Sequence, residues 1–490
     1  MSLVSFESFA LVFISLIVYY IVPIKHRWLV LLAGSLYFYA RSGIVITAVM
    51  AATAFIAYYG AILIEKDREK SKKILIFSIV LILAVLVCTK YLFGHLISFA
   101  HILIPIGISY YSLSLVGYLA DVYWKKDSAE HDFLRWLSFV AFFPKILQGP
   151  ISSHKVTGRN ITGENRFVYE NVCYGLQRMI WGLFKKLVIA DRLGLWVSTV
   201  YGDLEGYGNS GAFLIVTMFA SAVQLYMDFS GYTDIALGIS EMFGITLEEN
   251  FERPFFSTSA AGFWGRWHMT LSGWFKDYLF LPLSRTSAVK NASRKMGARF
   301  GADARKKTMI TICSAVVWLA TGIWHGAGVN YMVWGLYWGS IIIFSSIFEK
   351  QINGISRILH INTDAPTWKL FRMVRTVSIF AFGRMIATQP SLHEVRHIIR
   401  AVIKEFHPEH LSYIKYVYLS GYDFVMLAIG LITVLVISIL QERGMKVREC
   451  IATWNAIPRW IFYAFSLTVV LLVGVYGSGY DTSSFAYQFF

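Results

Sequence analysis

The chain has 490 residues, of which 56% are apolar and only 15% are charged. Soluble globular proteins carry about 25% charged residues, so this composition excludes a large soluble protein and indicates a chain covered by lipid over much of its surface. The formal net charge is +15. Because the basic residues lie mainly between apolar stretches, the positive-inside rule explains them better than nucleic-acid binding does.

Apolar stretches of the kind that cross a membrane recur along the whole chain, and each crossing needs about 20 residues. They are predicted at Leu3–Val22, Trp28–Ala40, Val45–Ile64, Ile74–Leu92, Ile102–Tyr123, Phe133–Leu147, Cys173–Ile189, Phe213–Met227, Ile235–Phe243, Met309–Trp324, Met332–Phe348, Phe371–Ile386, Phe424–Leu440 and Trp460–Val475. Several are short or contain proline, so we expect roughly 11 transmembrane helices with additional re-entrant or interfacial helices. The chain has neither an internal repeat nor a linker, and residues 1–490 are predicted to form a single all-α domain.

Basic loops predict the orientation in the membrane. Lys25 and Arg27 follow the first span, and five further basic residues follow the third. The loop Arg285–Lys307 carries eight basic residues against the single acidic residue Asp303. These loops are predicted to be cytoplasmic, which puts the N-terminus outside. Contact of the Arg285–Lys307 loop with anionic lipid headgroups or with the phosphates of a donor stays open as a second role.

Two carboxylates, Asp228 and Asp234, interrupt an otherwise apolar region. An ionised side chain at membrane depth costs at least a few kcal/mol and is often functional. The two residues are expected either to hold a histidine tautomer or to pair with Arg253 or Arg266. A structural role is favoured over a catalytic one for both.

His325 is the strongest candidate catalytic residue. It ends an apolar span about 25 Å from the cytoplasmic end, between Trp324 and Gly326. A neutral imidazole in an apolar site suits a general base near pH 7. A histidine that pins two helices through a carbonyl is about equally compatible with this position.

A second histidine, His268, lies two residues after Arg266 in the irregular amphipathic stretch Ser259–Pro282. This stretch is expected to lie in the membrane surface or to dip into it. Taken alone, His268 is favoured as an interfacial packing residue.

Neither a metal site nor a bound cofactor is predicted. The sequence contains no HExxH motif and no Walker loop. Its four cysteines show no CxxC spacing and therefore indicate neither a zinc site nor a disulfide framework.

Several motifs, in this order, resemble those of the membrane-bound O-acyltransferase (MBOAT) superfamily: Phe143–Ile151, Asp228–Asp234, Asn250–Phe255, Phe263–Ser272 and Trp324–Gly326. The resemblance covers about residues 104–338 and is closest to the bacterial branch of alginate O-acetylation subunits and teichoic acid D-alanyltransferases. It implies many helices around a central funnel with a catalytic histidine near its base. That role falls on His325 and the second family histidine on His268, with supporting or substrate-binding positions at Trp324, Gly326, Arg266, Asp228, Tyr232 and Asp234. The region Phe380–Ala387 matches the family pattern only loosely, so the resemblance assigns it no role.

The resemblance also implies a function. An acyl group, most plausibly acetyl, would pass from an acyl-CoA or acyl-carrier thioester in the cytoplasm towards hydroxyls of an extracytoplasmic polysaccharide or a partner protein. Expected partners are membrane lipid, a secreted or membrane-anchored acyltransferase and a small acyl carrier protein, at the bacterial inner membrane. Three alternatives stay open: D-alanyl transfer to teichoic acid, a transporter or flippase of an envelope precursor that uses Asp228, Asp234 and His325 as relay groups, and a non-catalytic scaffold.

Overall fold

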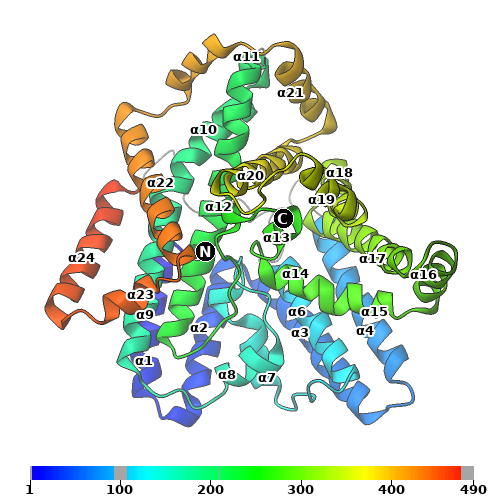
Figure 1. Cartoon of the computed structure of the whole chain (residues 1–490). Helices are drawn as coiled ribbons and strands as arrows, with labels where there is room; N and C mark the ends of the chain where they lie inside the picture. The colour runs from blue at the N-terminus through cyan, green and yellow to red at the C-terminus, as the bar shows by residue number, and fades with distance from the viewer. Residues whose placement is uncertain (1–2, 93–106, 209, 476–490) are drawn as a thin grey trace. The chain divides into compact units, whose positions relative to one another are not determined.

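The computed structural model describes residues 3–92, 107–208 and 210–475, and Figure 1 shows their helices. Extended pairing among these residues is limited to one antiparallel bridge between Phe251 and Trp267. The predicted all-α class is confirmed. The helices group into two compact units, and the chain passes from one unit to the other several times.

The first unit contains residues 1–191, 226–249 and 425–490. Its helices are α1 (Phe6–Ile21), α2 (Arg27–Ser42), α3 (Ile44–Lys66), α4 (Ser71–Val87), α6 (Ile108–Tyr123), α7 (Phe133–Ala141), α8 (Arg159–Ile161), α9 (Tyr169–Leu183), most of α22 (Gly421–Glu442), α23 (Val447–Ala452) and α24 (Ala456–Val473). Two π-helical stretches extend α4 and α9, namely η2 (Cys88–Leu92) and η6 (Phe184–Ala190).

The second unit contains residues 192–225 and 250–424. Its helices are α10 (Asp191–Gly202), α11 (Leu204–Tyr207), α13 (Ala260–Trp264), α14 (Met269–Phe275), α15 (Leu281–Ser284), α16 (Ser287–Phe300), α17 (Ala302–His325), α18 (Val329–Ile347), α19 (Glu349–Ile358), α20 (Pro366–Thr388) and α21 (Leu392–Lys404). The long helix α12 (Gly211–Met242) contributes its first half to this unit and its second half to the first.

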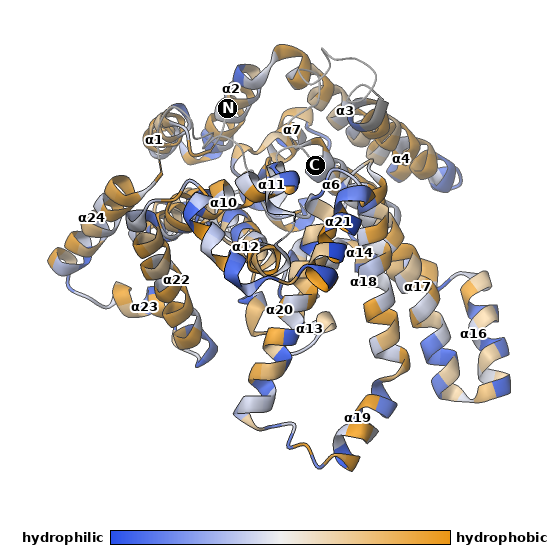
Figure 2. Ribbon diagram, turned by 90° about the horizontal axis from the view of Figure 1, so that it is seen from above, coloured by the Kyte–Doolittle hydropathy of each residue, from blue (hydrophilic) through white to orange (hydrophobic). Residues whose placement is uncertain are grey.

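Six helical stretches among the described residues are long and apolar enough to cross a membrane: α3, α4 with the start of η2, α12, α17, α22 and α24. The pair α18 and α19, bent by 62°, gives a seventh. Figure 2 shows α22 and α24 as apolar over most of their length. The chain is therefore a multi-pass membrane protein, whereas the count of 11 crossings stays a prediction.

Helix α12 corrects the predicted break between Phe213–Met227 and Ile235–Phe243, because one helix of 32 residues runs through both stretches and ends at Met242. The break was expected where the two carboxylates interrupt the apolar pattern. The helix continues because cations of the same unit neutralise those carboxylates, as described below. At Gly231 a Cβ would lie 2.9 Å from the carbonyl oxygen of Gly182, so the absent side chain lets α9 pack closely.

Two predicted spans are shorter in the structure. In place of one span at Phe133–Leu147, α7 ends at Ala141 and a short 3₁₀ turn, Phe143–Lys145, follows. Proline at position 144 cannot donate a helical hydrogen bond, which explains the break. The span predicted at Ile102–Tyr123 is helical from Ile108 onward, and residues 102–106 lie outside the described ranges.

The basic segment Arg285–Lys307 was expected to be a loop, but α16 and the first turns of α17 form most of it. The Thr286 side chain caps α16 by accepting a hydrogen bond from the Val289 main-chain nitrogen at 3.4 Å. Gly301, at a φ of 88°, makes the turn between α16 and α17, which lie side by side (Figure 1). Charged residues are good helix formers when solvent reaches them, so the missing apolar pattern did not prevent a helix.

Candidate active site

His325 is the last residue of α17 and lies where this helix meets α18. A Cβ added to Gly322 would lie 2.6 Å from the Tyr331 carbonyl oxygen, and one added to Gly326 would lie 2.3 Å from the Tyr331 ring. Small residues at a helix crossing allow such backbone contact. Residues of α18 thus fill the space beside both glycines.

Tryptophan rings surround the His325 imidazole. The Trp334 ring centroid lies 4.7 Å from that of His325, and the Trp324 centroid lies 4.9 Å away, both in edge-on geometry. His325 is 5% exposed. The imidazole is thus buried against two tryptophan rings, with only a small exposed surface.

His268 lies in a left-handed backbone conformation, with a φ of 46°, just before α14. Its Nδ1 is 3.0 Å from the Asn250 Oδ1, which also accepts hydrogen bonds from the Thr270 main-chain nitrogen at 3.2 Å and from the Thr270 Oγ1 at 2.9 Å. An amide nitrogen can only donate, so this Asn250 atom is an oxygen and the facing His268 Nδ1 carries a proton. In the neutral ring, Nε2 is then the proton acceptor.

The antiparallel bridge brings Asn250 to His268 although 18 residues separate them. The Met269 main-chain nitrogen donates to the Asn250 carbonyl at 3.0 Å, and the Glu252 nitrogen donates to the Arg266 carbonyl at 2.9 Å. Burial lowers the pKa of His268 to about 3, so its imidazole is neutral at pH 7. The motifs Asn250–Phe255 and Phe263–Ser272 therefore lie together, and Asn250 of the first fixes the tautomer of His268 in the second.

One aromatic cluster in the second unit contacts His325 and includes a tryptophan of the segment that carries His268. The Trp264 ring, four residues before His268, lies 5.9 Å from the Trp334 ring, which contacts His325. Trp264 also lies 4.9 Å from the Trp318 ring of α17. Trp324 and Gly326 are buried in the same region, and Arg266 is half-buried.

The predicted acidic residues lie in the first unit, among buried cations. Asp234 pairs with Arg178 at 3.0 Å and with Lys185 at 2.5 Å. Asp228, which is fully buried, pairs with Lys186 at 2.7 Å. The compensating charges thus come from α9 and η6, and neither Arg253 nor Arg266 provides these pairs.

Lys185 and Lys186 were not identified from the sequence. They stand together inside the apolar run Trp181–Ala190, so the rule that marks ionisable residues in apolar stretches would have found them. Both lie in the π-helical stretch η6, and π-helices are frequent at functional sites.

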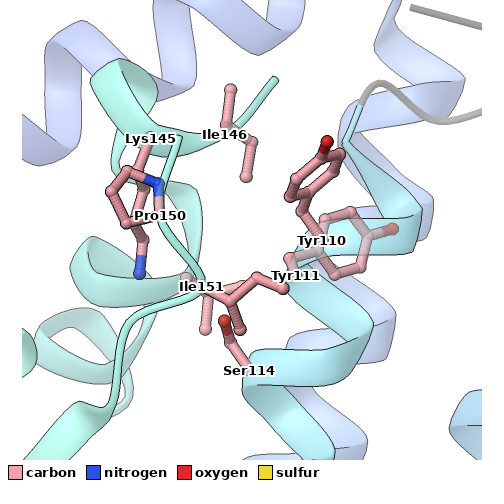
Figure 3. A pocket seen from close by; sticks show the side chains of 8 residues that line it. Tyr110, Tyr111, Ser114, Lys145, Ile146, Pro150 and Ile151 are labelled. Atoms are coloured by element: carbon pink, nitrogen blue, oxygen red, sulfur yellow. The ribbon is translucent and has the colours of Figure 1, made fainter. Parts of the chain in front are cut away.

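The motif Phe143–Ile151 lines a small cavity in the first unit, with room for about one water molecule (about 10 Å³). Figure 3 shows Lys145, Ile146, Pro150 and Ile151 on one side of it and residues of α6 on the other. The Lys145 ammonium is buried and lies 3.5 Å from the centre of the Phe139 ring. Tyr232, also fully buried, lies near the main chain of Leu147 in the same motif.

Comparison with known proteins agrees with these motifs. The sequence profile of MBOAT, the membrane-bound O-acyltransferase family, matches residues 42–357. The chain is 30% identical to the probable alginate O-acetylase AlgI of Pseudomonas syringae pv. tomato, over 60% of this chain and 50% of that protein. It is 29% identical to the peptidoglycan O-acetyltransferase of Helicobacter pylori, over 64% of this chain and 62% of that protein.

A third relative is the teichoic acid D-alanyltransferase of Bacillus subtilis, 29% identical over 50% of this chain and 60% of that protein. The aligned part of the chain thus spans about half to two thirds of the length of these three relatives. The family profile, in contrast, covers well over half of the chain. This polytopic helical protein belongs to the membrane-bound O-acyltransferase family.

Proposed function

We propose that this O-acyltransferase moves an acetyl group from a cytoplasmic thioester, acetyl-CoA or an acyl carrier, to a hydroxyl of an extracytoplasmic polysaccharide or of a partner protein. The observation that supports this proposal best is the tryptophan-rich cluster of the second unit, which contacts His325 and adjoins the His268 segment in a chain of this family. Two buried imidazoles near one aromatic cluster suit proton transfer at a hydroxyl.

In the proposed reaction, His325 takes the proton of the acceptor hydroxyl while the hydroxyl oxygen attacks the thioester carbonyl carbon. The carbon–sulfur bond then breaks, and the thiolate leaves with the proton that His325 received, which produces an ester and a thiol. His268 orients the acceptor, because its unprotonated Nε2 can accept a hydrogen bond from the hydroxyl. Trp324 or Trp334 must move for a substrate to reach the His325 ring, since that ring is 5% exposed.

The two substrates are proposed to enter from opposite sides. The basic helix α16 and the start of α17 would face the cytoplasm and attract the phosphates of the donor. The N-terminus would lie outside the inner membrane. The acceptor would enter at the His325 end of α17, and a secreted or membrane-anchored partner would complete the modification.

The test replaces His325 by alanine in a host strain whose own copy is deleted. We expect ester-bound acetate on the surface polymers to fall at least about 100-fold, the scale of general-base catalysis, while the protein stays in the membrane at its normal level. The control is His393→Ala, a histidine on α21 whose side chain is 82% exposed. Normal acetate in the His325→Ala strain would remove this residue from the mechanism.

The similarity to a D-alanyltransferase makes D-alanyl transfer to teichoic acid the second candidate function. The same polymers, hydrolysed with mild base, release either acetate or D-alanine. Loss of D-alanine with unchanged acetate in the deletion strain would favour this candidate.

A further inference from the structure

A buried arginine without a carboxylate partner lies near the end of α20. Arg384 is 8% exposed. Within the described ranges no carboxylate pairs with its guanidinium, and its Nε has no hydrogen-bond partner. A guanidinium keeps its charge at any physiological pH, and such a charge inside a membrane protein is costly and commonly functional. The positive charge of Arg384 would be stabilised by an anionic partner, and the described residues do not supply one.

A second polar group without a partner lies near it. The charge of the guanidinium acts electrostatically on Tyr201 of α10, so the two groups lie within the range of a Coulomb interaction in the same unit. The Tyr201 hydroxyl is buried and, among the described residues, has no hydrogen-bond partner. Gln389, directly after α20, is 1% exposed. Among the described residues, neither the oxygen nor the nitrogen of its carboxamide has a hydrogen-bond partner. Guanidinium, phenol and carboxamide can all donate hydrogen bonds to an oxygen atom.

The contacts between α18 and α20 place Arg384 along the neighbouring helix. The Tyr337 hydroxyl donates to the Ile379 carbonyl at 2.9 Å, and the Asn330 Nδ2 donates to the Gln389 carbonyl at 2.9 Å. The two helices are thus antiparallel. Arg384, between Ile379 and Gln389, lies level with the stretch of α18 between Tyr337 and Asn330.

This stretch of α18 is the one that contacts the candidate catalytic histidine. It carries Trp334, whose ring lies 4.7 Å from the His325 ring, and Tyr331, whose ring lies over Gly326. The Arg384 guanidinium also acts electrostatically on Tyr331. Arg384 and His325 therefore lie against the same first turns of α18.

We propose that Arg384 and Tyr201 form a subsite that binds an anionic oxygen group, a carboxylate or a phosphate, of a substrate and positions that substrate beside His325. This inference rests on the proposed function, in which His325 is catalytic. A guanidinium binds carboxylate and phosphate through two parallel hydrogen bonds, and the phenol adds a third donor. The subsite lies at the end of α17 opposite the basic segment, so an acidic group of the acceptor is its occupant. Arg384 acts as a positioning residue.

The test measures anion binding to the purified full chain in detergent, by calorimetry, without any acyl transfer. The probes are D-glucuronate, inorganic phosphate and coenzyme A, with glucose as the neutral comparison. We expect the wild type to bind glucuronate or phosphate and not glucose. Arg384→Met should raise the Kd for the bound anion at least tenfold, whereas Arg384→Lys, which keeps the charge but not the two-pronged geometry, should raise it less.

Two further variants and a control make the result specific. Tyr201→Phe removes one oxygen atom and should raise the same Kd several-fold, so the subsite can be tested even if Arg384→Met does not fold. Lys369→Gln, which removes an exposed charge from the same helix α20, should leave the Kd unchanged. His325→Ala should abolish acyl transfer and keep anion binding, so a failure of the proposed function and a failure of the subsite give different results.

The probes also identify the substrate that uses the subsite. Loss of glucuronate or phosphate binding in Arg384→Met, with coenzyme A binding unchanged, supports the acceptor as the occupant. Loss of coenzyme A binding alone would support the subsite but assign it to the donor. Equal binding of every anion by the wild type and by Arg384→Met and Tyr201→Phe, or no binding of any anion by the wild type, would overturn the proposal.

Discussion

The Asn250 side chain fixes the proton on one nitrogen of His268. Asn250→Ala removes the acceptor 3.0 Å from Nδ1, so the ring can take either tautomer and turn. We expect acyl transfer to fall by about 100-fold, because the unprotonated Nε2 no longer faces the acceptor reliably. The measurement is ester-bound acetate on the surface polymers at equal protein level. Thr270→Val keeps the main-chain hydrogen bond to Asn250 and should retain most activity, and full activity in Asn250→Ala would contradict the role given to this pair.

His268 also makes stability depend on pH. Its pKa is about 3 in the folded protein and about 6.5 in an unfolded chain, so between these values the unfolded state binds more protons. Stability therefore falls as the pH decreases through this range, by about 2 kcal/mol from pH 6.5 to pH 5 for this one group. Thermal unfolding in detergent at pH 7 and pH 5 should show a smaller loss for His268→Gln than for the wild type. An identical loss in both proteins would show that the ring is not buried as a neutral group.

Sequence patterns identify the two histidines but not the residue that orients one of them. His325 stands out because an ionisable residue at the end of an apolar span is unusual, and His268 because it lies among tryptophans. Asn250 lies 18 residues before His268 in an irregular segment. Its role depends on the antiparallel bridge between Phe251 and Trp267, which no periodic sequence pattern predicts. Arg384 was left without a role because Phe380–Ala387 matches the family pattern only loosely, and the missing carboxylate partner becomes visible only in the structure.

At the scale of elements, buried charges of α9, η6 and α12 pair with one another inside the first unit. Lys186 pairs with both Asp228 at 2.7 Å and Asp191 at 2.8 Å. Lys186→Met removes the cation that the two carboxylates share and should cost about 3–5 kcal/mol of stability. Asp228→Asn should cost less, because Lys186 keeps its pair with Asp191. Thermal unfolding of both purified variants checks this order, and a Lys186→Met protein as stable as Asp228→Asn would contradict it.

The existence of the helices follows from apolar periodicity, whereas their lengths depend on tertiary partners. The predicted spans Val45–Ile64 and Phe424–Leu440 agree with α3 and α22 to within three residues at each end. In α12 the prediction failed because carboxylates that end an isolated apolar run are compatible with a helix when lysines on a neighbouring helix neutralise them. In α16 it failed because a charged helix has no apolar face to detect.

At the largest scale, the contacts of the second unit determine which of its helix ends share a side. The 24 residues of α17 rise about 36 Å, enough to cross a hydrocarbon core of about 30 Å. At its first turns, Asp303 pairs with Lys350 at 3.2 Å and Lys307 donates to the Ile347 carbonyl at 2.8 Å, so α18 returns to the same level. Helix α20 then runs antiparallel to α18 and ends beside Asn330.

We predict that α16 and α21 lie on opposite sides of the membrane, with α16 in the cytoplasm as the positive-inside rule assigns. Single cysteines at Lys290 of α16 and His393 of α21, both exposed positions, test this assignment. The background is a chain in which the four native cysteines are replaced by serine or alanine. A membrane-impermeant maleimide should label His393→Cys in intact cells stripped of their wall, and Lys290→Cys only after the membrane is opened. The reverse pattern would invert the proposed entry sides of donor and acceptor, and labelling of both sites in intact cells would contradict the prediction that they lie on opposite sides.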